Sequence, residues 1–435
     1  MADAALPGSP AAISGEPRRD AAPGEVLRTA DGRPLKAALA RSSRRARLRA
    51  FLLVAPLLAF VLVTFAIPIG QMLYRSVHNV QFAANMPELV AWFAENPQGA
   101  EIDESAFAAL ASDLRTGAAE RRIGTVATRI NYEVPGTRSL FTGTARRAAT
   151  LEAPYREALL EINADWGRPD LWQAMRGASS RHTANFYLAA VDRKRDIDGS
   201  IVQVQERQRV YVQLFWRTLL LSLVITTLTL ILGFPVAHLL ATLPLRTANL
   251  LMILVLLPFW TSLLVRTTSW IVLLQNQGVV NSTLVSMGIL SDDGRLNMMY
   301  NQLGTIIAMT HILLPFMILP LYSVMKTIPP SYVRAARSLG ASSWTAFRRI
   351  YLPQTVPGIG AGAILVFILS VGYYITPALV GGASGQLISN QIAFHMLNSL
   401  NWSLAAALAG ILLASILILY WLYDRLIGID NMKFG

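Results

Sequence analysis

The amino-acid sequence predicts an all-α membrane protein. Of its 435 residues, 53% are hydrophobic and 15% are charged, and the mean hydropathy is +0.43. This composition lies outside the range of soluble globular domains. Several apolar stretches reach the roughly 20 residues that a helix needs to cross the hydrocarbon core of a bilayer. They lack the alternation of apolar and polar residues that marks barrel strands, so helices are expected.

Six stretches are long and apolar enough to form membrane-spanning helices. They lie near residues 51–74, 216–241, 250–274, 302–325, 357–378 and 403–423. Prolines inside several of them are expected to produce kinks, because neighbouring helices can satisfy the carbonyl groups that a proline leaves free. Three small residues in the fifth stretch, Gly358, Gly360 and Gly362, are expected to allow close helix packing.

The distribution of charge predicts the topology. The net charge is +12; residues 1–50 carry ten basic and five acidic residues, and residues 326–353 carry five basic residues and no acid. Residues 79–210 are nearly balanced, with sixteen basic and seventeen acidic residues. Because cytoplasmic loops are enriched in Lys and Arg, the two basic segments are expected in the cytoplasm. Six crossings then place both termini inside and residues 79–212 outside.

These observations divide the chain into five expected parts. They are a disordered basic cytoplasmic tail (1–48), a first transmembrane helix (49–78), an external, periplasmic insertion (79–212), a core of five transmembrane helices with a cytoplasmic loop at 326–356 (213–425), and a cytoplasmic C-terminal tail (426–435). The composition of the insertion favours a small, largely helical domain. It is either a contact surface for an external partner or a decoration without a separate function.

Several classes of chemistry have no basis in this sequence. There is no cysteine, none of the four lysines follows a glycine as a nucleotide-binding P-loop requires, and the five histidines lack metal-ligand spacing. We therefore expect no catalytic residue, no metal and no cofactor. Basic residues are not interleaved with aromatics, so nucleic acid is not expected as a partner. The spans also lack the pairs of acids that proton relays use, so uphill transport would need energy from another chain.

A basic segment, RAARSLGASSWTAFRRIYLP at residues 334–353, interrupts the apolar part of the chain with four arginines and no acid. We expect a helix capped by Ser331, in which Ala335 and Ala336 present almost no side chain to a neighbouring surface. Gly340 is expected to form a sharp turn at the end of this helix.

A second helix is expected after that turn. Ser342 or Ser343 can cap it, and Pro353 is expected to end it. Its apolar face and its basic last turn consist of Trp344, Phe347 and Ile350, and of Arg348 and Arg349. The segment should therefore form a compact cytoplasmic helix-turn-helix with a basic rim.

This segment resembles the cytoplasmic loop of permeases in binding-protein-dependent ABC importers, which follows the pattern E-A-A, three residues, G, nine residues, I-x-L-P. The matching residues are Ala335, Ala336, Gly340, Ile350, Leu352 and Pro353, and Arg334 stands where the family has glutamate. The stretches PFWTSLLVRTTSWIVLLQNQGVVN (258–281) and VGYYITPALVGG (371–382) look like the spermidine/putrescine-type branch. The resemblance covers about residues 212–425.

The resemblance implies a six-helix type I ABC importer permease fold with a large insertion after the first helix. It implies a non-catalytic inner-membrane subunit that forms the path for a small organic solute, such as spermidine, putrescine or another amine. The implied partners are two ATPase subunits that hold the loop at residues 334–353, a second permease subunit, a periplasmic substrate-binding protein and the lipid membrane.

Four residues are candidates for the solute path, namely Trp260, Arg266, Tyr373 and Tyr374. Tyrosine rings attract cations, but aromatic residues near a membrane interface also serve as anchors. Arg266 can equally extend to the outer interface.

Two other functions remain open from sequence. One is a membrane-anchored sensor or adhesion protein whose external domain binds a ligand. The other is a secondary transporter, which is disfavoured because the spans offer no acidic coupling-ion site and show no inverted repeat.

Overall fold

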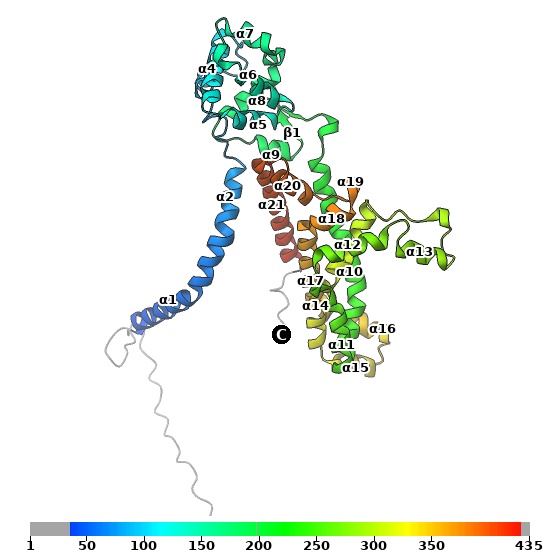
Figure 1. The fold of residues 1–435 in the computed structure, drawn as a ribbon. Coiled ribbons are helices and arrows are strands. Elements are labelled where there is room, and N and C mark those ends of the chain that lie inside the picture. The colour runs from blue at the N-terminus through cyan, green and yellow to red at the C-terminus, as the bar shows by residue number, and fades with distance from the viewer. Residues whose placement is uncertain (1–34, 197, 428–435) are drawn as a thin grey trace, which may run out of the picture. The chain divides into compact units, whose positions relative to one another are not determined.

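The computed structural model describes residues 35–196 and 198–427 (Figure 1). The described chain is mostly helical, as predicted, with one short antiparallel hairpin of strands β1 (Arg193–Arg195) and β2 (Ile201–Gln203). Its contacts divide it into two units, one up to Gly70 and the other from Gln71 onward.

The first unit consists of an apolar helix. It comprises α1 (Leu35–Val61), the π-helical turn η1 (Leu62–Ala66) and the beginning of α2 (Ile67–Arg75). Disorder was predicted through residue 48, but α1 already begins at Leu35; residues 1–34 of the predicted tail lie outside the described residues. Residues Ala46–Arg75 form a candidate span in which no residue of the apolar window is buried. Such a surface is stable in a hydrocarbon environment.

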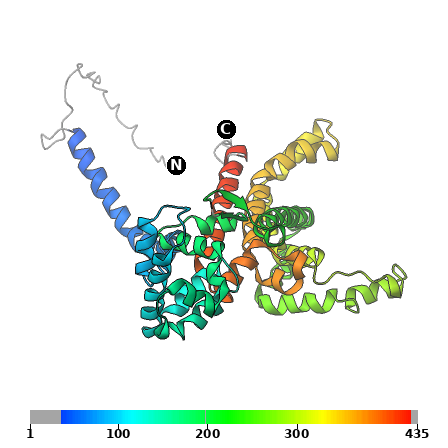
Figure 2. The same ribbon diagram turned by 90° about the horizontal axis from the view of Figure 1, so that it is seen from above.

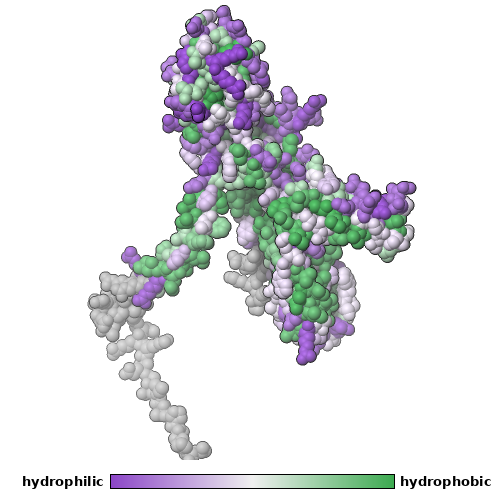
Figure 3. Space-filling model, viewed as in Figure 1, coloured by the Kyte–Doolittle hydropathy of each residue, from purple (hydrophilic) through white to green (hydrophobic). Residues whose placement is uncertain are grey.

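Residues after α2 fold into a helical domain with its own hydrophobic core. Its helices are α3 (Pro87–Glu95), α4 (Glu104–Ala119), α5 (Ile123–Asn131), α6 (Thr137–Ala145), α7 (Tyr155–Ile162), α8 (Pro169–Ser179) and α9 (Asn185–Ala190), with short 3-10 turns η2 (Ala148–Thr150), η3 (Ala164–Gly167) and η4 (Glu206–Gln208). Hydrophilic residues dominate its surface (Figure 3). The helical character agrees with the expectation for this segment.

Aromatic side chains organise the core of this helical domain. Trp166 is fully buried, and its ring meets Phe141 edge to face at a centroid distance of 5.0 Å. The indole nitrogen of Trp172 donates to the carbonyl of Trp166 at 2.7 Å, so this buried polar group is satisfied. Burial of one such side chain contributes about 2–3 kcal/mol.

The membrane part contains four further straight spans. They are α10 (Tyr211–Thr242), α14 (Gln302–Thr327), the continuous segment Ser343–Gly372 and α21 (Trp402–Ile427). Hydrophobic residues gather over α10–α12 (Figure 3). The remaining elements are α11 (Leu245–Leu256), η5 (Leu257–Trp260), α12 (Leu263–Leu274), α13 (Val279–Ser286), η6 (Asp292–Gly294), α15 (Pro330–Ser338), α16 (Ser343–Ala346), η7 (Phe347–Tyr351), α17 (Leu352–Gly372), α18 (Ile375–Val380), α19 (Gly382–Gly385) and α20 (Ile388–Leu397).

The predicted third span is not one straight helix. Helices Leu245–Trp260 and Leu263–Ser286 meet at 97°, so the described residues contain five candidate spans and a sixth only if this bent pair is counted as one. Pro258 lies in the 3-10 turn before the bend, where it cannot donate a backbone hydrogen bond. Ser262 then caps α12 by accepting a bond from the backbone amide of Val265 at 3.1 Å. A new helix therefore begins where the predicted span would have continued.

Close packing holds α10, α14 and α17 together. A Cβ atom added at Gly362 would lie 2.7 Å from the sulfur of Met317, and one at Gly358 would lie 3.0 Å from the Cβ of Val324, both on α14. Gly360 faces the hydroxyl of Tyr423 on α21. The packing role predicted for these glycines is confirmed, because larger side chains would separate the helices.

Asp192 joins the helical domain to the first core helix. Its carboxylate accepts hydrogen bonds from the backbone amides of Val210, Tyr211 and Val212 at 3.1, 3.1 and 2.8 Å. A negative charge at this end of a helix is favourable because the backbone amides there lack partners. Helix α9 also packs against α21 through Phe186 and Leu408.

A second buried carboxylate, Asp113 of α4, caps α3 inside the helical domain. It accepts bonds from the backbone amides of Glu88 at 3.2 Å and Leu89 at 2.8 Å. Burial raises the pKa of Asp113 from 3.8 to about 6, although the two amide bonds act in the opposite direction. The folded carboxyl therefore keeps its proton at pH values where an exposed aspartate has lost it.

This pKa predicts that the local stability of α3 falls as pH rises from about 4 to 7. Between the unfolded pKa of 3.8 and the folded pKa of about 6, the opened state binds fewer protons than the folded state, so opening becomes easier with rising pH. Hydrogen exchange at Leu89, corrected for the intrinsic rate, should lose protection by about tenfold or more. Asp113→Asn should show a flat profile, and protection that rises with pH in the wild-type protein would refute this assignment.

Candidate functional site

The loop between α14 and α17 contains the first helix and turn that the sequence predicts. Helix α15 begins with Pro330 as its first helical residue, so Ser331 does not cap it; this prediction was wrong because proline already fits the position where no amide partner is needed. At the other end, the amide of Gly340 donates to the carbonyl of Arg337 and that of Ala341 to Ala336, both at 3.0 Å. This pair of bonds is a Schellman motif.

Gly340 is required by the geometry of this turn. Its φ angle is +89°, which side chains other than glycine rarely adopt, while a Cβ atom there would meet nothing within 4 Å. Any penalty for substitution therefore comes from backbone strain and not from a clash. The predicted turn is confirmed as a structural feature.

The second helix begins as predicted but does not end as predicted. Ser342 caps α16 by accepting a bond from the amide of Thr345 at 3.2 Å. The expected stop at Pro353 is wrong, because α16, the π turn η7 and α17 form one span from Ser343 to Gly372.

The π turn explains how the helix passes Pro353. In η7 the amide of Leu352 bonds to the carbonyl of Phe347, five residues back, which widens the helix before the proline. Pro353 then lies in the first turn of α17, where a missing amide hydrogen costs nothing. The same arrangement precedes Pro68 in the first span, where the amide of Ile67 bonds to the carbonyl of Leu62. A π turn that ends two residues before a proline keeps both helices continuous.

A row of aromatic rings fastens the loop to α10. Phe347 stacks on Trp344 at 5.7 Å and on Tyr351 at 5.9 Å between ring centroids. Phe347 also meets Phe234 of α10 edge to face at 6.1 Å. The hydroxyl of Tyr351 lies 3.0 Å from Nδ1 of His238, also on α10. The predicted apolar face is real, but its inner contact is Tyr351, which the sequence analysis did not single out.

The outer surface of this loop is exposed and basic. Leu339 and Trp344 are 89% and 68% exposed, which is unusual for such large apolar side chains in a polar setting. The arginines at positions 334, 337, 348 and 349 are exposed around them. Figure 2 shows the segment that carries α15 and α16, in yellow, extending away from the packed helices. Apolar anchors inside a charged rim are typical of protein interfaces.

The predicted loop residues are either exposed or partly buried. Arg334, Ala335 and Pro353 are exposed, whereas Ala336, Ile350 and Leu352 are partly buried. Arg334 and the two alanines lie on α15, and Ile350 lies in the π turn. The loop thus offers a small-residue and basic face to its surroundings and an aromatic face to α10.

The two tyrosines of the predicted path mark a break between α17 and α18. The carbonyl of Tyr374 accepts a bond from Nδ2 of Asn390 at 2.8 Å, and the carbonyl of Tyr373 accepts one from the hydroxyl of Ser389. Both donors belong to α20. These bonds satisfy backbone groups that the break would leave unpaired, which is a requirement inside a membrane.

Arg266 lies near this break. The hydroxyl of the next residue, Thr267, lies 3.2 Å from that of Thr376 in α18, and Nη2 of Arg266 donates to the carbonyl of Thr261 at 3.3 Å. The Nε of Arg266 is buried and has no partner within the described part of the chain. Trp260, in contrast, is 80% exposed and shares no ring contact or hydrogen bond with the other three among the described residues. The structure therefore places Arg266 on the helix that contacts α18 at this break, whereas Trp260 has no such contact among the described residues.

Three buried hydroxyl groups were missed by the sequence analysis. Ser222, Thr310 and Ser370 lie on α10, α14 and α17, and their hydroxyl oxygens have no partner among residues 35–196 and 198–427. Polar residues inside apolar spans are the signal that would have singled them out.

A cavity of about 380 Å³ lies between α10, α11 and α14. Aliphatic side chains and His311 line it, and none of the four predicted path residues does. Its lining suits hydrocarbon better than a polar solute. Across the described ranges, no group of three or more His, Asp or Glu side chains is arranged to hold a metal ion.

These features define a multi-pass membrane protein whose helical core carries an exposed, rigidly anchored basic loop. The chain belongs to the family described as binding-protein-dependent transport system inner membrane component, whose family model matches residues 212–427. It is therefore an inner-membrane permease component of an ABC importer with the predicted type I fold. The helical domain between α2 and α10 lies outside this match.

Two relatives agree with this family. The chain is 36% identical over 222 residues to the spermidine/putrescine transport system permease protein PotB of Haemophilus influenzae, covering 50% of this chain and 77% of that protein. The PotB protein of Escherichia coli K12 is also 36% identical, with 80% of its length covered. A bacterial ABC transporter involved in the import of the acidic polysaccharide alginate matches with a TM-score of 0.40 and 23% identity, over 50% of this chain and 79% of that chain.

The aromatic row predicts unequal effects of two substitutions. Phe347→Ala should lower the free energy of unfolding by about 2–3 kcal/mol, because this ring contacts four others. Trp344→Ala should cost less than about 1 kcal/mol, because its side chain is largely exposed. Thermal unfolding of the detergent-purified variants measures both. Equal losses would show that Phe347 does not anchor the loop.

Proposed function

We propose that this chain forms half of the translocation path of an ATP-driven importer and pairs with a second permease subunit. Two ATPase subunits bind on the cytoplasmic side, and a periplasmic binding protein delivers the solute. The N- and C-termini and the α14–α17 loop lie in the cytoplasm, and the helical domain lies in the periplasm. The excess of basic residues in the first 50 residues and in the loop supports this orientation.

The observation that carries the proposal is the anchored loop. Its exposed side offers apolar anchors and arginines, and its buried side is fixed to α10 and continuous with α17. A partner that moves this loop must therefore move two core helices with it. Closure of the ATPases on ATP can in this way bias the core between two discrete arrangements.

The proposed solute is a small amine of the spermidine or putrescine kind. The names of the PotB relatives support this class. The tyrosines at the α17–α18 break add aromatic rings that attract cations by about 0.5–2 kcal/mol each. The proposed path residues are Arg266, Tyr373, Tyr374 and Trp260.

Gly340→Val should uncouple the permease from its ATPases. A β-branched residue at φ +89° costs about 1–3 kcal/mol and should open the turn between α15 and α16. In the reconstituted complex with a spermidine-loaded binding protein, we expect at least a tenfold loss of stimulated ATP hydrolysis, with membrane insertion unchanged.

Gly288→Val is the matched control for this experiment. Gly288 has φ +71° and open space around its Cβ position, but it follows α13 and not the loop. The Gly288→Val variant should retain stimulated ATP hydrolysis. Unchanged hydrolysis in Gly340→Val would contradict the coupling role, and a wild-type complex that spermidine and putrescine fail to stimulate would contradict the solute class.

Arg334 should face an acidic residue of the ATPase. Its exposed guanidinium replaces the glutamate of the family pattern, so the partner surface should carry the opposite charge. Arg334→Glu should weaken binding of the ATPase by about tenfold, whereas Arg246→Glu, in the exposed α10–α11 region, should change it little. Binding is measured by titration of detergent-purified components. Stronger assembly with Arg334→Glu would refute the pairing.

A further inference from the structure

A cavity of about 250 Å³ lies between the helical domain and the beginning of α21. Its lining comes from the end of α2 and the residues after it, from α5 and α9, and from residues 400–403. Two arginines and a histidine, Arg75, Arg129 and His78, contribute to the lining, and no acid does. Glu133 pairs with Arg129, so Arg75 supplies the unpaired positive charge of this lining, which favours a negatively charged guest.

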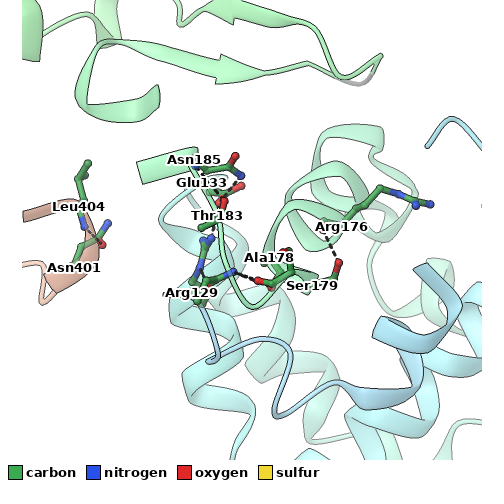
Figure 4. A network of polar contacts seen from close by, with 11 residues as sticks. Arg129, Glu133, Arg176, Ala178, Ser179, Thr183, Asn185, Asn401 and Leu404 are labelled. Atoms are coloured by element: carbon green, nitrogen blue, oxygen red, sulfur yellow. Dashed lines mark hydrogen bonds and ion pairs between the residues drawn. The ribbon is translucent and has the colours of Figure 1, made fainter. Parts of the chain in front are cut away.

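Arg129 is the unusual member of this cavity. It is 1% exposed, and its Nε donates to Asn79 Oδ1 and its Nη2 to Glu133 Oε1, both at 2.7 Å. The guanidinium lies 4.9 Å from the ring centre of Phe186. Figure 4 shows Glu133, Thr183 and Asn185 gathered beside Arg129. These contacts fix the position of the charge.

One nitrogen of this fixed guanidinium lacks a hydrogen-bond acceptor among the described residues. Nη1 of Arg129 is buried and has no hydrogen-bond partner in the part of the chain that the structure describes, and the same is true of Nδ1 of His78. An unpaired buried donor on a charged group costs about 1–3 kcal/mol or more. A site that keeps such a donor beside a cavity is set up to receive an acceptor.

Other donors surround the same space. Asn401 uses its Oδ1 to accept a bond from Leu404, so its amide nitrogen remains available. Arg75 is exposed and forms no ion pair or hydrogen bond among the described residues. Trp402 and Ser403 add an indole nitrogen and a hydroxyl to the lining. Arginine with several neutral donors is the usual chemistry of phosphate recognition.

The position of the cavity along the spans indicates the source of the phosphate. Arg75 is the last residue of the first span, and Trp402 is the first residue of the last one. Leu400 and Trp402 are exposed beside it. Tryptophan and arginine at such positions lie at the level of lipid head groups.

We propose that this cavity binds a phosphate-type oxyanion, supplied by a phospholipid head group in the leaflet on the side of the helical domain. The phosphate accepts hydrogen bonds from Arg129, Arg75 and Asn401. Because the cavity joins the helical domain to the start of α21, the bound head group ties this domain to the membrane surface.

Native mass spectrometry of the full chain in detergent tests the proposal. The protein is titrated with short-chain phosphatidylglycerol, with a short-chain diacylglycerol that lacks phosphate, and with inorganic phosphate. We expect one phosphatidylglycerol per chain and no retained diacylglycerol. Inorganic phosphate that binds as tightly as the lipid would support the oxyanion site but overturn the head group as its source.

Three substitutions assign the binding to this cavity. Arg129→Gln should weaken phosphatidylglycerol binding at least tenfold, and Arg75→Gln about threefold. Arg146→Gln, an exposed arginine of the same domain outside the cavity, should bind like the wild-type protein. If Arg129→Gln does not fold, the test rests on Arg75→Gln, which should fold because the Arg75 side chain is exposed. Wild-type affinity in the folded cavity variants, or equal retention of lipids with and without phosphate, would overturn the proposal.

Discussion

The helix that continues through Pro353 connects the basic loop to the membrane core, and the proposed function depends on this connection. A proline at this point would ordinarily end the helix and leave the basic loop on a flexible connection. The π turn at Phe347–Tyr351 removes that break, so the loop and the membrane core share one helix from Ser343 to Gly372. Along the same helix, Gly358 and Gly362 lie directly against Val324 and Met317 of α14. A displacement of the loop therefore moves α17, which packs against α14 in the centre of the core.

The loop and the helical core were predictable because each depends on short-range sequence signals. Length and hydropathy placed the spans, and the spacing from Ala335 to Leu352 marked the loop. The passage through Pro353 was not predictable, because a π turn leaves no distinct residue pattern. The contact of Tyr351 with His238 joins residues that are far apart in sequence, and nothing local encodes it. The 97° bend after Pro258 was expected only as a kink.

The helical domain depends on buried polar groups at its junctions. Asp192 holds the first turn of α10, and Asp113 holds the first turn of α3. Each carboxylate accepts hydrogen bonds from backbone amides. Composition predicted that residues 79–212 are helical, but it gave no sign that an arginine would be buried there. Arg129 is one of sixteen basic residues between positions 79 and 210, and only tertiary structure separates it from those that solvate the surface.

Site-specific photo-cross-linking from Leu339 tests whether an ATPase subunit binds the α14–α17 loop. Its side chain is 89% exposed at the tip of α15, so a photoreactive residue there should not disturb the fold. Ile289, which is 60% exposed after α13, provides the control position. The account predicts that the probe at position 339 captures the ATPase subunit in membranes and that the probe at position 289 does not. Failure to capture the ATPase from position 339, or equal capture from both positions, would contradict it.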